Sequence, residues 1–211
     1  MTVATRRSTS TIPLATLVLG TLVAWVAFVR LGMSSVGFVA FMAGWVVMMT
    51  AMMLPSAAPL VLVYGKRGRG RLVLGYLLIW AIVGLPVYAV ARAVDLMMVP
   101  AAAVAAVLVV AGAYQFTPLK NVCLRTCRSP LDFIAMRWGR GPVRLGAEHG
   151  GYCLGCCWGL MAVVVVAAAM SVTWAAAIAA VVFAEKVLPG GEWTARVAGF
   201  ALFAGAAVVL V

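Results

Sequence analysis

The sequence has little charge, and acidic residues are especially few. Only 10% of its 211 residues are charged, with 5 Asp or Glu against 16 Lys or Arg, whereas soluble domains carry roughly 25%. A single histidine and the lack of paired carboxylates within apolar segments argue against hydrolytic or proton-pumping chemistry. Five cysteines, an odd number, cannot all pair within one chain. These shortages exclude a soluble globular domain, a disordered tail and a disulfide-stapled secreted module.

Apolar residues dominate instead. They make up 66% of the chain, and the mean hydropathy is +1.14. Because a membrane span needs about 20 mainly apolar residues, uncharged stretches of that length predict the spans. We predict an all-α, polytopic membrane helix bundle of six to seven transmembrane helices, forming a single integral membrane domain over residues 1–211. The predicted spans are residues 8–29, 36–65, 72–91 and 96–119, two within 150–184, and a short one at 197–211.

Prolines and polar residues set the expected boundaries of these spans. Pro55 and Pro59 predict a kink near residues 51–55, and Pro118 is expected to close the fourth span. The fifth and sixth spans are expected to turn around Ser171–Thr173. The first span has an alternative interpretation as a cleaved signal peptide, but no small-x-small site precedes Arg30.

The basic residues predict the orientation in the membrane. A cytoplasmic N-terminus places fourteen of the 16 Lys and Arg inside, and only Arg30 and Arg92 outside. Since cytoplasmic loops are enriched in Lys and Arg, we predict a multi-pass membrane protein with its N-terminus in the cytoplasm. Residues 120–148 are then a basic cytoplasmic loop, which we expect to contain a short helix and to lie against anionic lipid. The net charge of +11 therefore indicates lipid contact and not nucleic acid binding.

The five cysteines form two groups on the predicted cytoplasmic side. The first group is Cys123 and Cys127, and the second is Cys153, Cys156 and Cys157. That compartment is reducing, so free thiols are expected there. On a helix, the only histidine and the second group share an arc of about 100°. The two members of the first group are helical neighbours, and Arg125 and Arg128 are expected to favour their thiolate forms. We expect the two groups to approach each other and complete a soft-metal site; its proposed ligands are Cys123, Cys127, His149, Cys153, Cys156 and Cys157.

The cysteines have other interpretations. Cysteine is common in membrane helices as a small apolar residue, and interfacial cysteines can be palmitoylated. Two clusters beside the only histidine favour a metal or redox site over both.

A methionine stripe precedes Pro55, formed by Met48, Met49, Met52 and Met53. Thioethers are neutral soft ligands that favour Cu(I), so the stripe is a candidate relay within the bilayer. A methionine stripe at helical spacing is more often packing, and both interpretations stay open. Glu185 and Lys186 end the sixth predicted span, where we expect an interfacial pair that snorkels to water.

Four motifs carry a family resemblance. The run Met48–Pro55 resembles the Ala-Met-Met-x-Pro motif of a bacterial family of predicted metal-binding integral membrane proteins, sometimes described as copper-related. Three further segments are similar to the same family and occur in its order: 114–120 followed by Cys123 and Cys127, then 149–158, then 185–189. The resemblance implies a multi-helix protein of the bacterial inner membrane that binds metal, without an assigned enzymatic reaction.

The sequence thus predicts a membrane-embedded soft-metal-binding protein and not an enzyme. Its metal is expected to be Cu(I), with zinc as an alternative, handled or delivered through the Cys/His cluster and the methionine stripe. Expected partners are the lipid bilayer, the metal ion, and a copper-carrier protein or membrane complex. The rival hypotheses are a membrane thiol-disulfide oxidoreductase and an assembly subunit of a larger membrane complex.

Overall fold

The computed structural model describes residues 11–31, 37–94, 99–137, 139–167 and 171–211. Within these ranges all regular structure is helical, which confirms the predicted all-α class. The α-helices are α1 (Thr11–Leu31), α2 (Phe38–Val63), α3 (Arg69–Ala93), α4 (Ala101–Tyr114), α5 (Pro118–Arg128), α6 (Pro130–Ala135), α7 (Pro142–Ala167), α8 (Val172–Val187) and α9 (Gly191–Leu210), and a short 3₁₀ turn, η1 (Lys66–Gly68), precedes α3.

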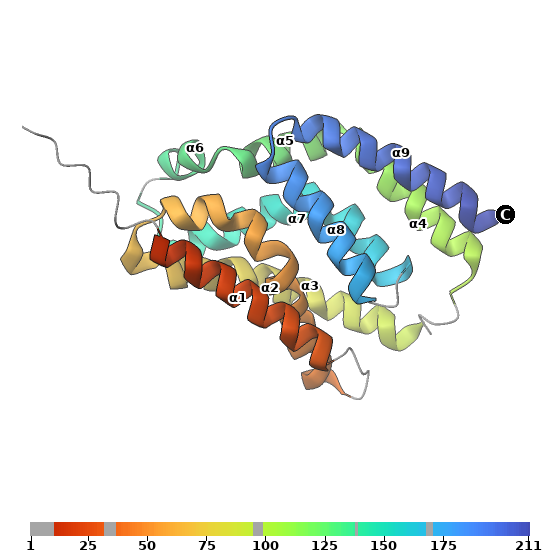
Figure 1. Ribbon diagram of the computed structural model, residues 1–211, viewed down its shortest axis with the longest axis horizontal. Helices are drawn as coiled ribbons and strands as arrows, with labels where there is room; N and C mark the ends of the chain where they lie inside the picture. Colours follow the sequence, from red (N-terminus) through yellow and green to blue (C-terminus); the bar gives the residue numbers. More distant parts are fainter. Residues whose placement is uncertain (1–10, 32–36, 95–98, 138, 168–170) are drawn as a thin grey trace, which may run out of the picture.

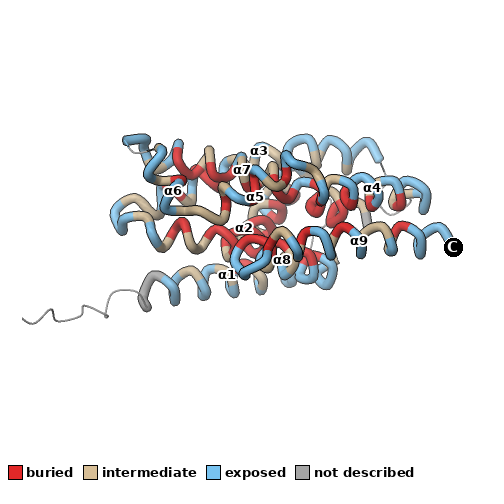
Figure 2. The backbone as a smooth tube through the Cα atoms, turned by 90° about the horizontal axis from the view of Figure 1, so that it is seen from above, coloured by how far each residue is buried: buried red, intermediate tan, exposed pale blue. Residues whose placement is uncertain are grey.

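Helix α7 is the centre of the bundle and packs against α3, α4, α5 and α8. Helix α2 lies between α1 and α3 on one side, while α4 and α9 pair on the other side (Figure 1). Buried residues concentrate along the inner helix faces, and the outward faces of the peripheral helices are exposed (Figure 2). The two cysteine-bearing helices, α5 and α7, therefore pack directly on each other.

The close contact between α3 and α7 depends on two glycines. A Cβ atom at Gly75 would collide with the carbonyl oxygen of Val143, and one at Gly146 would collide with that of Leu72. Small residues at such crossings let two helix backbones approach each other, as is common between membrane helices. This contact fixes α7, and with it the cysteines, against α3.

Four helical segments are long and apolar enough to cross a membrane: 38–63, 66–93, 142–166 and 191–210. A fifth is obtained if α4 and α5, which are bent by 66° at residues 115–117, count as one broken span. Helix α8 has 16 residues and is shorter than a typical span. These helices are compatible with a membrane protein; the total of six to seven spans and the cytoplasmic N-terminus stay predictions.

The predicted boundary at Pro118 is wrong. Helix α4 ends at Tyr114, and Pro118 opens α5. Proline is favoured in the first turn of a helix, where its missing N–H removes no hydrogen bond. Thr117 caps α5, because its hydroxyl accepts a hydrogen bond from the amide of Lys120. Residues 120–148 form most of α5, all of α6 and the start of α7.

The shapes and ends of α2, α8 and α9 can also be compared with the predicted spans. Helix α2 contains Pro55 and Pro59 and bends along its length (Figure 1), as these prolines predict. Helix α9 starts at Gly191 and has 20 residues instead of the expected 15. Helix α7 ends at Ala167 and α8 begins at Val172, next to the turn predicted around Ser171–Thr173; residues 168–170 and Asp95 lie outside the described residues.

Candidate metal centre

The two cysteine groups meet in the middle of the bundle. Helix α7 presents Cys153, Cys156 and Cys157 on a buried face, each at most 1% exposed. Helix α5 brings Cys127 to this face, with its Sγ 3.9 Å from the Sγ of Cys156. The juxtaposition expected from the sequence is therefore present, and these cysteines are free thiols.

A second sulfur pair joins α7 to the methionine stripe. The Sγ of Cys157 lies 3.9 Å from the Sδ of Met53. The other three methionines of the stripe, Met48, Met49 and Met52, are buried in the same core cluster as the cysteines. Among the described residues, Met53 is the member of the stripe in contact with a thiol, and the other three share its buried core.

Three of the predicted Cys and His ligands, Cys123, Cys153 and His149, join no sulfur pair among the described residues. Cys123 lies against Gly155, where a Cβ atom would come within 2.7 Å of its Sγ. The ring of His149 lies between Tyr76 and Phe133, with ring centroids 6.0 and 5.1 Å away. The Nδ1 atom of His149 is buried without a hydrogen-bond partner in the described structure. Cys123 and His149 therefore lie beside the two sulfur pairs without belonging to either.

The donors form pairs and not larger sets. Across the part of the chain that the structure describes, no group of three or more His, Cys, Asp or Glu side chains is arranged to hold a metal ion. Zinc is bound by four protein ligands in structural sites and by three in catalytic ones. Paired sulfurs are instead suited to a soft monovalent ion, because thiolate and thioether ligands select Cu(I).

A buried lysine lies directly beside the thiols. The Nζ of Lys186 is 2.8 Å from the Sγ of Cys153 and 3.4 Å from the Oγ of Ser56. The hydroxyl of Tyr76 lies 3.0 Å from the same Sγ. No carboxylate pairs with Lys186 in the described ranges. The sulfur cluster therefore has a positive charge next to it that is shielded from water.

A buried ion pair forms the other side of the cluster. The Nζ of Lys120 on α5 lies 2.7 Å from the Oε2 of Glu185 on α8, and both side chains are at most 1% exposed. The same Nζ donates to the carbonyl oxygen of Cys156 at 3.0 Å. This pair fixes α5 and α8 to α7 at the level of the cysteines.

Two expectations about charged residues are wrong. Glu185 and Lys186 do not snorkel to water but point into the bundle, with 0% and 6% exposure. The arginines expected beside the thiols interact elsewhere: Arg125 pairs with Glu192, and Arg128 donates to the carbonyl oxygen of Glu185. The cation in contact with a thiol is Lys186.

The spacing of apolar residues in the sequence indicates that Lys120 and Lys186 are buried. Lys186 follows Val182 by four residues and Ile178 by eight, so it continues the buried stripe of α8. Lys120 similarly shares a helix face with Cys123, Leu124 and Cys127, which are the buried residues of α5. Residues three and four apart are neighbours on a helix, and this spacing predicts burial in spite of the charge.

The fold and the paired sulfurs together define an all-helical protein with cysteine and methionine sulfurs buried in its core. A family model described as PpoB2: Copper chaperone matches residues 42–209. The chain belongs to this copper chaperone family, which supports a copper-handling role and agrees with the copper-related resemblance of its motifs. No curated protein and no solved structure matches the chain.

Proposed function

We propose that this protein is an integral membrane protein that binds Cu(I) at buried sulfur pairs and passes the ion on. The observation that carries the proposal is the 3.9 Å approach of Cys127 on α5 to Cys156 on α7. A metal bound to two sulfurs at about 2.3 Å each holds them at most about 4.6 Å apart. The two sulfurs therefore need little movement to bind one ion.

The chemistry of the pair favours Cu(I) over zinc. Thiolates and thioethers are soft ligands, and two of them suffice for Cu(I). Zinc needs more ligands than either sulfur pair provides. Cu(I) bound by two thiolates has a net charge of −1, and the ammonium group of Lys186 beside Cys153 offsets that charge inside the bundle.

The pair formed by Cys157 and Met53 supports transfer as well as storage. Met53 belongs to α2 and forms the buried methionine stripe together with Met48, Met49 and Met52. A neutral thioether binds Cu(I) without adding charge, so these residues form a route of weaker sites leading to the thiols. We propose Cys127, Cys156 and Cys157 as the main ligands, with Cys123, Cys153 and His149 as accessory ligands.

Metal analysis of the purified protein tests this proposal. The protein, kept reduced in detergent, is titrated with Cu(I) against a competing chelator, and its metal content is measured after desalting. Near-stoichiometric copper with a Cu–S signal in X-ray absorption supports the proposal. A protein that retains no copper under these conditions, or prefers zinc at equal supply, contradicts it.

The same 3.9 Å approach also suits a thiol-disulfide oxidoreductase as a second candidate function. Closing the pair into a disulfide brings the two sulfurs to about 2.05 Å. The two electrons and two protons that this step releases reduce a substrate disulfide to two thiols by exchange. A reversible Cys127–Cys156 disulfide in protein without metal, detected by differential alkylation and mass spectrometry, favours this alternative.

A further inference from the structure

A basic cavity opens at one end of the bundle, away from the sulfur cluster. It lies where α2 ends, where α3 and α7 begin, and beside α6, and it has a volume of about 1150 Å³. Small-molecule sites measure about 300–1,000 Å³, so the space is large enough for a bulky ligand. Its position at the ends of three membrane-length helices corresponds to the headgroup level of a bilayer.

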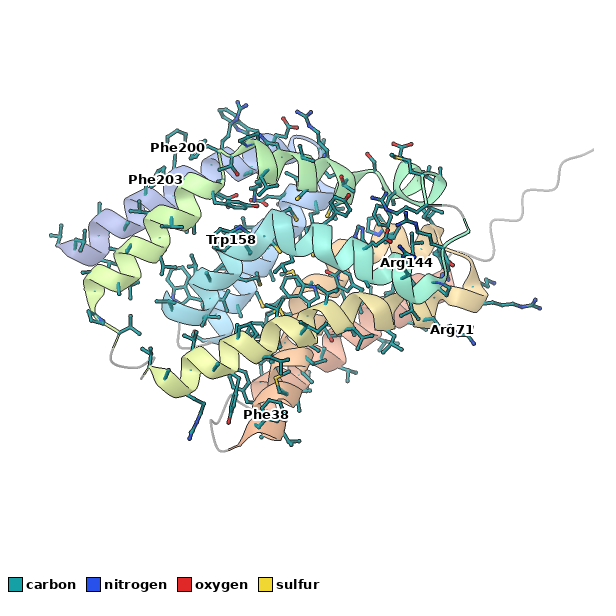
Figure 3. All side chains as sticks on the ribbon, turned by 180° about the vertical axis from the view of Figure 1, so that it is seen from behind. Phe38, Arg71, Arg144, Trp158, Phe200 and Phe203 are labelled. Carbon is teal, nitrogen blue, oxygen red and sulfur yellow. The ribbon has the colours of Figure 1, made fainter. Side chains whose placement is uncertain are left out.

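Cations surround this cavity. Lys66, Arg67 and Arg71 line it from the η1 turn and the start of α3, and Arg137 and Arg140 line it from the α6–α7 connection. Arg71 is at the same end of the molecule as Arg144 of α7 (Figure 3).

Most of this positive charge lacks a protein counter-charge. Arg137, Arg140 and Arg144 all pair with one carboxylate, that of Glu148. In the described structure Lys66 and Arg67 form no ion pair. Among the described residues, Asp132 is the single acidic one that lines the cavity. The surplus of cations predicts an anionic ligand.

The remaining wall of the cavity is apolar. Val63 and Leu145 line it from α2 and α7, and Leu131 and Ile134 line it from α6. A small inorganic anion needs no such wall, whereas a phospholipid presents a phosphate next to a glycerol and acyl region. Basic pockets between membrane helices bind lipid headgroups of this type.

We propose that this cavity binds the phosphodiester headgroup of an anionic phospholipid. Lys66, Arg67 and Arg71 contact the phosphate, and the apolar wall contacts the adjoining glycerol region. The site is separate from the copper-binding cysteines and does not depend on them.

Lipid retention measured by native mass spectrometry tests the site. The full-length protein is released from bilayers of phosphatidylcholine with or without phosphatidylglycerol, and bound lipids are counted. We expect wild type to retain phosphatidylglycerol in preference to phosphatidylcholine. The Arg67→Gln/Arg71→Gln variant should bind phosphatidylglycerol about thirtyfold more weakly, because each surface cation contributes about 1 kcal/mol to such binding.

The control variant is Arg92→Gln/Arg196→Gln, which lowers the net charge equally but leaves the cavity intact. It should retain phosphatidylglycerol as wild type does. Asp132→Asn provides a test that cannot result from misfolding, since removing the acid should strengthen retention about fivefold.

Three outcomes overturn the proposal. One is equal retention of the two lipids by wild type, and another is an equal loss in the cavity and control variants. The third is binding of inorganic phosphate in detergent with the same dependence on Arg67 and Arg71 while no lipid is retained, which would assign the cavity to a free anion.

Discussion

Lys186 Nζ lies 2.8 Å from the Sγ of Cys153, inside a bundle where this ammonium group forms no ion pair with a carboxylate of the described residues. A buried charge is costly unless it is paired. The partner of Lys186 is therefore a thiol, that of Cys153. If the thiols bind a metal ion as thiolates, the positive charge of Lys186 offsets the negative charge of the complex. This relationship links a residue of α8 to the function proposed for α5 and α7.

Replacing Lys186 should weaken copper binding without unfolding the protein. We expect Lys186→Met to lower the Cu(I) affinity about 10–100-fold, as is typical when a group that supports metal ligands is removed. Lys186→Arg keeps the charge and should lose less. Chelator competition measures both affinities, and thermal unfolding in detergent checks the fold. An unchanged affinity in Lys186→Met would show that the charge beside Cys153 does not act on the metal.

The Cys127–Cys156 pair should act as a unit. We expect Cys127→Ser and Cys156→Ser each to abolish high-affinity Cu(I) binding, because a neutral hydroxyl replaces a soft thiolate. The double variant should bind no worse than either single one, since residues that share one function give non-additive effects. Cys123→Ser should weaken binding much less than either, because Cys123 lies on the same helix but contacts Gly155 instead of a second sulfur. Full binding by Cys127→Ser would place the site elsewhere.

The sequence predicted most of the helices but not the surroundings of the cysteines. Uncharged length located α2, α3 and α7 because bilayer thickness sets the length of a span. It misplaced the end of α4, since Pro118 can open a helix as well as close one. It also placed Lys120 and Lys186 in water, because the ion pair with Glu185 and the contact with Cys153 join helices far apart in the chain.

Breaking the buried ion pair should destabilise the protein. Glu185→Gln leaves the charge of Lys120 without a partner, and we expect a loss of about 3–5 kcal/mol in unfolding free energy. Glu192→Gln is the control: its pair with Arg125 is largely exposed, and such pairs contribute about 1 kcal/mol or less. The double variant Lys120→Met/Glu185→Leu should recover much of the loss. Equilibrium unfolding in mixed micelles measures all three, and equal effects of Glu185→Gln and Glu192→Gln would contradict the structural role of the buried pair.

The predicted orientation is testable with introduced cysteines. The native thiols are at most 8% exposed, so they give little background labelling. We expect Arg140→Cys, at the basic end of the bundle, to be protected from an impermeant thiol reagent in intact cells. Val94→Cys, at the end of α3, should be labelled, because the fourteen-to-two distribution of basic residues places that end outside. Labelling of Arg140→Cys from outside would show that the topology is the reverse of the predicted one.

Variants of the methionine stripe distinguish a copper relay from simple packing. Met-to-Leu changes are nearly volume-conserving and typically cost less than about 1.5 kcal/mol, so Met53→Leu and Met48→Leu/Met52→Leu should both fold. Leucine has no donor atom for copper. Met53→Leu should therefore weaken binding at Cys157, whereas Met48→Leu/Met52→Leu should leave equilibrium binding intact and slow the transfer of Cu(I) to an acceptor chelator.

The exposed Met136 on the α6–α7 connection is the control for this comparison, because it is 80% exposed and remote from the stripe in sequence. Met136→Leu should transfer copper at the wild-type rate. Stopped-flow transfer in reconstituted vesicles measures the rates, and circular dichroism confirms the helical content. If Met48→Leu/Met52→Leu matches Met136→Leu while Cys156→Ser loses binding, the stripe is packing and the thiols alone handle the metal.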